Sequence, residues 1–152
     1  MNETVEKQPI EKTSPQKIAL RVQKGIRQAE DDIVLAVQDA LNTCEYPTSG
    51  RDELEESQFR NLVRVSDTTE SAEVVKNFLR YQVGRERKWG RGEKSLATRI
   101  VGDIDGMLLQ TAENIAKESG DNDQKAIWIE LIRRYLGYGA RHLKYLKSER
   151  EG

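Results

Sequence analysis

The sequence predicts an all-α protein that folds as a single compact bundle of about five helices. Helix-forming Glu, Lys, Arg, Gln, Ala, Leu and Ile are abundant, whereas only 3 Pro, 2 Phe and 2 Trp occur. Apolar residues recur at steps of three and four over long segments, which is typical of helices with one buried face. The 152 residues, 36% of them hydrophobic, have the size of one domain. Residues 1–13 are polar and are predicted to form a flexible tail ahead of a helical domain at 14–148.

The first helix is expected to begin at Ser14 and Pro15. A serine followed by proline is typical of an N-cap and first helical position, where the missing N–H of proline costs nothing. The apolar positions then form one stripe from Ile18 to Leu41. We therefore expect this helix to run to about Asn42.

Two shorter helices are expected next. The segment 46–50 has the composition of a loop and precedes an amphipathic stretch that runs from Leu54 to near Asp67. The polar run 67–73 offers several N-caps for a third helix. Gly84 is well placed to be the residue that follows the end of that helix.

A loop and two further helices complete the predicted bundle. The segment 85–93 has two glycines, little apolar content and no helical period, so it is predicted to be an exposed loop. Apolar residues over 96–115 mark a fourth helix that should end before Gly120. Asp121 or Asp123 can cap the fifth helix, which contains the last apolar stripe.

Two glycines, Gly137 and Gly139, stand inside the fifth helix beside Tyr138. Each weakens an isolated helix by about 1 kcal/mol relative to alanine. Either a close helix–helix crossing or a local kink would explain them, and both explanations are structural.

Charge is distributed unevenly along a chain whose formal net charge is -1. Residues 76–100 contain eight Lys and Arg against only Glu86 and Glu93, whereas the N-terminal half is acidic. Cations that can meet phosphates indicate a nucleic-acid surface, and Trp89 among them is placed either to stack on an unpaired base or to pack against the bundle. A solvated surface or a patch that docks a protein explains the same cations. Arg133 and Arg134 are more simply explained as partners of Glu130 or of the acidic half.

The residues that catalysis or metal binding would require are sparse. His142 is the only histidine and Cys44 the only cysteine, so nucleophilic catalysis would have to be built on them. The acidic run Asp103–Asp105 lacks the further ligands of a calcium loop. We therefore expect no enzyme, no metal and no cofactor. A lone cysteine and the absence of a signal sequence or an apolar span favour a cytoplasmic protein that makes no membrane contact.

Two segments together resemble a known family. They are Ser57-Gln-Phe-Arg-Asn61, continuing into the helix that ends near Arg85, and Leu131-Ile-Arg-Arg-Tyr-Leu-Gly-Tyr-Gly-Ala-Arg141. In their order and composition they resemble the small helical subunit of type III CRISPR effector complexes, over roughly 54–147. In that family an S-Q-x-R element opens an early helix, and a late helix has an aliphatic stretch followed by tyrosine, small residues and arginine.

The resemblance implies a non-catalytic subunit that lines the groove for guide RNA and target RNA, and that packs against copies of itself and against other effector subunits. By position, Arg60 and Arg141 correspond to the arginines of the two elements. The loop cations have no counterpart in the family pattern, and their assignment depends on charge alone. The alternative function is a helical protein–protein adaptor that binds no nucleic acid. From charge and resemblance together, the candidate contact residues are Arg60, Arg80, Arg85, Arg87, Lys88, Trp89, Arg91, Arg134, Arg141 and Lys144.

Overall fold

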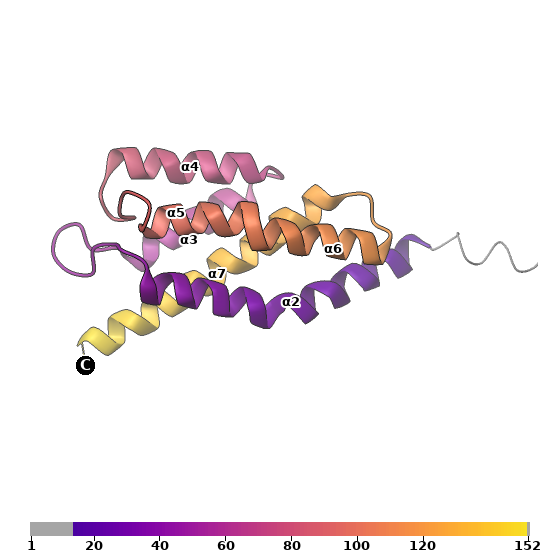
Figure 1. The fold of residues 1–152 in the computed structure, drawn as a ribbon, viewed down its shortest axis with the longest axis horizontal. Helices are drawn as coiled ribbons and strands as arrows, with labels where there is room; N and C mark the ends of the chain where they lie inside the picture. Colours follow the sequence, from indigo (N-terminus) through magenta and orange to yellow (C-terminus); the bar gives the residue numbers. More distant parts are fainter. Residues whose placement is uncertain (1–13, 152) are drawn as a thin grey trace, which may run out of the picture.

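A computed structural model describes residues 14–151 and confirms the all-α bundle (Figure 1). Its α-helices are α2 (Pro15–Thr43), α3 (Glu56–Asp67), α4 (Ala72–Arg85), α5 (Leu96–Asp103), α6 (Leu109–Ser119) and α7 (Gln124–Glu151). The π-helical turn η2 (Ile104–Leu108) joins α5 to α6 without a break, so these segments form the single fourth helix that the sequence predicts. The predicted tail, 1–13, lies outside the described residues.

Most of the predicted helix ends are confirmed. The Ser14 hydroxyl accepts a hydrogen bond of 3.2 Å from the Lys17 amide, with Pro15 at the first helical position. Gly120 ends α6 in the left-handed conformation at φ 84°, and Asp123 accepts a 3.2 Å bond from the Ala126 amide at the start of α7.

The predicted end of the third helix at Gly84 is wrong. α4 continues through Gly84 to Arg85, and the next residue, Glu86, has extended backbone. The Arg91 side chain explains how the helix ends without a left-handed glycine. Its Nη2 donates to the carbonyl of Val83 at 2.9 Å and so satisfies a group in the last turn.

Helix α7 is the centre of the bundle. It packs against α2, α3 and α6, and its buried residues include Leu131, Ile132, Tyr135 and Leu136. Helix α4 lies on the outer side of α3 and α5, and α2 lies on the opposite side of the bundle (Figure 1). The loops 44–55 and 86–95 meet at one end of the molecule, where Glu45 and Ser95 form a parallel backbone bridge.

One of the two glycines in α7 marks a close helix crossing. A Cβ atom built on Gly139 would collide with the Phe59 ring of α3, and it would lie 3.0 Å from Val37 Cγ2 of α2. Gly137 has no atom within 4 Å of such a Cβ. Of the two explanations offered by the sequence, the close crossing holds at Gly139, and it does not involve Gly137.

The π-helical turn is held by contacts from α4 and α7. The indole N–H of Trp128 donates to the Ile104 carbonyl at 2.8 Å, which satisfies a backbone group at the irregular turn. Asp105 forms a 2.6 Å ion pair with the buried ammonium of Lys76. Asp103 accepts a 2.6 Å hydrogen bond from the Tyr135 hydroxyl. The acidic residues that superficially resemble a calcium loop thus serve to join three helices.

Candidate nucleic-acid interface

The ten predicted contact residues do not form one surface. One group lies on α4 and the loop that follows it, a second lies where α3 packs on α7, and a third lies along α7 where it packs on α2. The groups differ in how exposed their side chains are and in whether nearby carboxylates neutralise them.

The largest group is on α4 and the following loop. Arg80, Arg85, Arg87, Arg91 and Lys94 are all exposed. Within 14–151, none of the five has a carboxylate at ion-pair distance. We call these five residues the α4 basic surface. Their charges are available to an anionic partner, because uncompensated exposed cations are what phosphate groups attract.

Two further cations of the segment 76–100, Lys76 and Arg99, are neutralised by carboxylates. Lys76 pairs with Glu73 at 2.9 Å and with Asp105. Burial lowers the pKa of Lys76, but its hydrogen bonds to the two carboxylates outweigh burial and the net pKa is raised. Arg99 is bound at 2.8 Å by Asp39 and at 2.9 Å by Asp103. Neither side chain is free to meet a phosphate.

Two loop cations also have structural roles. Lys88 Nζ lies 3.3 Å from the carbonyl oxygens of both Arg51 and Glu53, and so fastens the loop 86–95 to the loop 44–55. Arg91 completes the end of α4 through its bond to Val83. Lys88 is half-buried and is less available to a ligand than sequence alone indicates, whereas Arg91 remains exposed.

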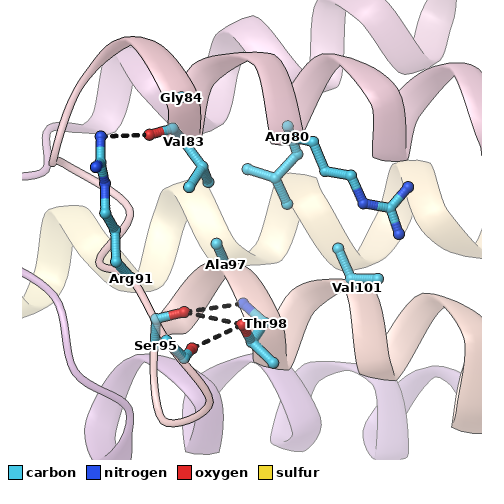
Figure 2. A pocket seen from close by; sticks show the side chains of 10 residues that line it. Arg80, Val83, Gly84, Arg91, Ser95, Ala97, Thr98 and Val101 are labelled. Atoms are coloured by element: carbon cyan, nitrogen blue, oxygen red, sulfur yellow. Dashed lines mark hydrogen bonds between the residues drawn. The ribbon is translucent and has the colours of Figure 1, made fainter.

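Arg80 and Arg91 stand on the rim of a cleft between α4 and α5 (Figure 2). The cleft has a volume of about 510 Å³. Leu79, Val83, Ala97 and Val101 supply most of its apolar wall, and Ser95 and Thr98 close one end by hydrogen bonding to each other at 3.1 Å. A cleft with an apolar wall and two arginines at its rim suits an apolar group that carries negative charge.

The prediction that Trp89 stacks on an exposed base is wrong. Trp89 is 0% exposed, and its ring packs edge-on against Phe59 with centroids 5.1 Å apart. Gly90 allows this inward path, because its φ of +76° suits glycine and a Cβ there would collide with the Glu45 carbonyl. The segment 85–93 is thus a loop with exposed cations that is anchored in the core by its single tryptophan.

Arg134 is also neutralised, which contradicts its prediction as a contact residue. Its guanidinium forms ion pairs of 2.7 Å with Glu30 and 3.0 Å with Glu130. A hydrogen bond from the Tyr138 hydroxyl is the main cause of the lowered pKa of Glu30, and the bonds from Arg134 add to it. The interpretation of Arg134 as a partner of Glu130 and of the acidic half is confirmed.

Arg60 and Lys144 lie together in a small hollow between α3 and α7. Acidic side chains share this hollow, and Glu56 forms a 3.0 Å ion pair with Arg60. Lys147, from the same hollow, pairs with Glu53 at 3.0 Å. Because opposite charges alternate here, the hollow attracts phosphate less than the α4 basic surface does.

Arg141 lies on the α2 side of α7. Its guanidinium is 5.7 Å from the centre of the Tyr138 ring, and the hollow beside it also contains His142 and Tyr145. The Nε2 atom of His142 is 2.9 Å from the amide oxygen of Asn42, and burial lowers the pKa of this histidine. The nearest polar partner of the single histidine is thus an uncharged amide.

One aromatic residue of functional interest is absent from the predicted set. Tyr81 is 56% exposed on α4, with the Arg85 guanidinium 5.6 Å from its ring centre. The apolar residues of α4 fall on two stripes, and the one that contains Val75 and Leu79 is buried. The other stripe, which contains Val74 and Tyr81, is exposed. The helical spacing of its apolar residues is the sequence signal that distinguishes it from the buried stripe.

The described residues hold neither a cluster of metal ligands nor a membrane-spanning helix. Over 14–151, no three His, Cys, Asp or Glu side chains are grouped so that they could hold a metal ion. None of the helices in this part of the chain combines the length and the apolar character that crossing a membrane requires.

No protein family, characterised protein or solved structure in our comparisons matches this chain.

Proposed function

We propose that this chain is a non-catalytic RNA-binding subunit of a type III CRISPR effector complex. In this proposal it contacts guide RNA and target RNA through phosphates, without reading sequence, and packs against other effector subunits and copies of itself. The observation that supports RNA binding most directly is the α4 basic surface, with five exposed cations that have no carboxylate partner within 14–151. The type of complex is supported by the resemblance of the segments 57–61 and 131–141.

The physical basis is the release of counterions from the nucleic acid. Each cation that meets a phosphate displaces a condensed counterion, so the affinity falls as salt rises. If all five cations make a contact, a slope of about 0.7 per contact predicts a roughly 100-fold loss of affinity between about 50 and 200 mM salt. Contacts of this kind depend little on base sequence.

The test is fluorescence anisotropy of the purified protein with a labelled unstructured RNA at these two salt concentrations. The variant R85Q/R87Q/K94Q removes three exposed cations and spares Lys88 and Arg91, which hold the loop. With about two contacts left, the loss of affinity over the same salt range should shrink to about 7-fold. At low salt, this triple variant should also bind the RNA more weakly than wild-type protein does.

A matched control removes the same amount of charge elsewhere. Arg21, Lys24 and Lys117 are exposed on α2 and α6. They belong to the N-terminal part of α2 and the C-terminal part of α6, which lie at the end of the bundle away from the loop 86–95 (Figure 1). R21Q/K24Q/K117Q should keep most of the affinity and of the salt dependence. Equal losses in both triple variants would show that the α4 basic surface is not the binding site.

A helical adaptor is the second candidate function, and the cleft between α4 and α5 favours it. An apolar wall beneath Arg80 and Arg91 fits an acidic peptide segment with a large apolar side chain better than it fits a phosphate backbone. This function predicts no RNA binding at either salt concentration. It also predicts that V83D, which places a carboxylate in the cleft, abolishes binding of an acidic leucine-containing peptide.

A further inference from the structure

Tyr81 is exposed on α4 between Arg80 and Arg85, two members of the α4 basic surface. It is 56% exposed, whereas Trp89, the aromatic residue of the adjoining loop, is fully buried. Arg80 precedes it, and Arg85 lies one helical turn further along α4. An aromatic ring that is mostly in water contributes little to the core, and Tyr81 stands beside cations that have no carboxylate partner within 14–151.

The ring of Tyr81 is held in place by its neighbours. Arg85 lies 5.6 Å from the ring centre, and its Nη1 is 3.5 Å from the tyrosine hydroxyl. On the same helix, the Phe78 ring is tilted by 41° to Tyr81 with centroids 6.3 Å apart. A side chain positioned in this way loses little conformational freedom when a ligand stacks against it.

The surroundings of Tyr81 form a stripe along α4. Val74, Phe78, Tyr81 and Arg85 are spaced at i, i+4, i+7 and i+11, which places them on one side of the helix. Val74 is 46% exposed, so the apolar character of the stripe continues at the surface. Cations alone suffice to bind the phosphates of a paired duplex. An exposed ring adds affinity only when it can stack on a base that is not already stacked within a duplex.

We infer that Tyr81 stacks on an unpaired base of the RNA strand that the α4 basic surface holds. This inference rests on the proposed function and names its ligand more closely: a single-stranded segment, with phosphates at Arg80 and Arg85 and a base against Tyr81. The stack is tolerant of sequence, because every base has an aromatic face. Tyr81 takes the role that charge and composition assign to Trp89.

Two labelled probes of equal charge test this inference. One is an oligouridylate of about ten nucleotides, and the other is an abasic chain with the same number of phosphates. Wild-type protein should bind the oligouridylate more tightly. Y81L keeps an apolar side chain without a ring, and should lose about 5- to 150-fold in affinity for the oligouridylate, the range for one base–aromatic stack. It should bind the abasic chain as wild type does, and Y81W should restore the preference for bases.

Tyr145 provides a matched control. It is 55% exposed on α7, nearly the same fraction as Tyr81, but it lies outside the α4 basic surface and its ring is stacked with His142 at 5.9 Å. Y145L should bind both probes as wild type does. If Y81L and Y145L lose the same affinity for the oligouridylate, or if only Y145L loses affinity for it, the assignment of the stacked base to Tyr81 is overturned.

The outcomes separate this inference from the proposed function. If wild-type protein binds both probes equally, with a steep salt dependence that R85Q/R87Q/K94Q reduces, RNA binding is supported and the stacking role of Tyr81 is refuted. A loss of affinity for both probes in Y81L also refutes stacking, since it shows that the residue supports the fold or the cations instead. If wild type binds neither probe at low salt, both proposals fail. Far-UV circular dichroism checks that each variant is folded.

Discussion

Replacing Gly139 by alanine should destabilise the protein, although alanine is the better helix former. The added Cβ would meet the Phe59 ring, with Cδ1 at 2.9 Å, and Val37 Cγ2 at 3.0 Å. Phe59 is 0% exposed and packs against the buried Trp89, so its ring has no space into which it can move. Neighbouring Gly137 has no such contacts and is the natural control.

The magnitude follows from two opposing effects. Overpacking a well-packed core costs about 1–3 kcal/mol, and the fixed Phe59 ring places Gly139 near the upper end. Alanine in a helix interior recovers about 1 kcal/mol. G139A should therefore lower the free energy of unfolding by about 2 kcal/mol. In G137A only the better helix propensity of alanine acts, so this substitution should raise the free energy of unfolding by up to about 1 kcal/mol.

Urea unfolding followed by far-UV circular dichroism measures both variants. With a slope of about 2 kcal/mol per molar urea, the two midpoints should differ by about 1.5 M, on opposite sides of wild type. The slopes themselves should stay equal, because the substitutions do not change the surface exposed on unfolding. A G139A protein as stable as G137A would refute the close crossing of α7 with α3 and α2.

Two further predictions concern Trp89 and Glu30. W89A should lose about 3–5 kcal/mol of stability in thermal or urea unfolding, since the ring is fully buried. W89F should fold and keep wild-type RNA affinity in the anisotropy titration, because the ring contacts Phe59 and not the ligand. E30Q should cost about 1–2 kcal/mol at neutral pH, because the carboxylate accepts hydrogen bonds from Tyr138 and Arg134. This deficit should shrink in urea titrations as pH falls below about 4.3.

The sign of the E30Q prediction follows from the lowered pKa of Glu30 in the folded state. A lowered pKa means that Glu30 stabilises the fold above the usual glutamate pKa, and that this contribution is lost as pH falls through the lower folded value. E113Q, on the exposed face of α6, is the control and should show a small effect at neutral pH. A deficit in E30Q that grows toward acid pH would contradict the role given to this carboxylate. Similarly, an RNA affinity that falls in W89F without a loss of stability would contradict the burial of Trp89.

Local signals in the sequence determined the helices. The Ser14–Pro15 cap, the left-handed Gly120 and the stripe along α2 all act within a few residues, so they could be located without knowing the fold. The basic character of the segment 76–100 was also evident, because charge is a property of composition. Gly84 was misplaced because α4 continues through it to Arg85, and the Arg91 side chain of the following loop satisfies the Val83 carbonyl that a glycine cap would otherwise serve.

Tertiary structure alone decided which of these side chains are available to a ligand. The pairing of Arg134 with Glu130 was indicated by their spacing, but its second partner, Glu30, lies more than a hundred positions away and no local pattern identifies it. Trp89 is buried because the loop turns inward at Gly90 beside Glu45. Composition and periodicity report which residues are present and which face of each helix is apolar. Whether a charge is neutralised or a ring is exposed depends on the side chains that pack against it from other helices and loops. Local patterns therefore account for the bundle and its basic segment, and the packing of the helices selects the exposed cations and Tyr81.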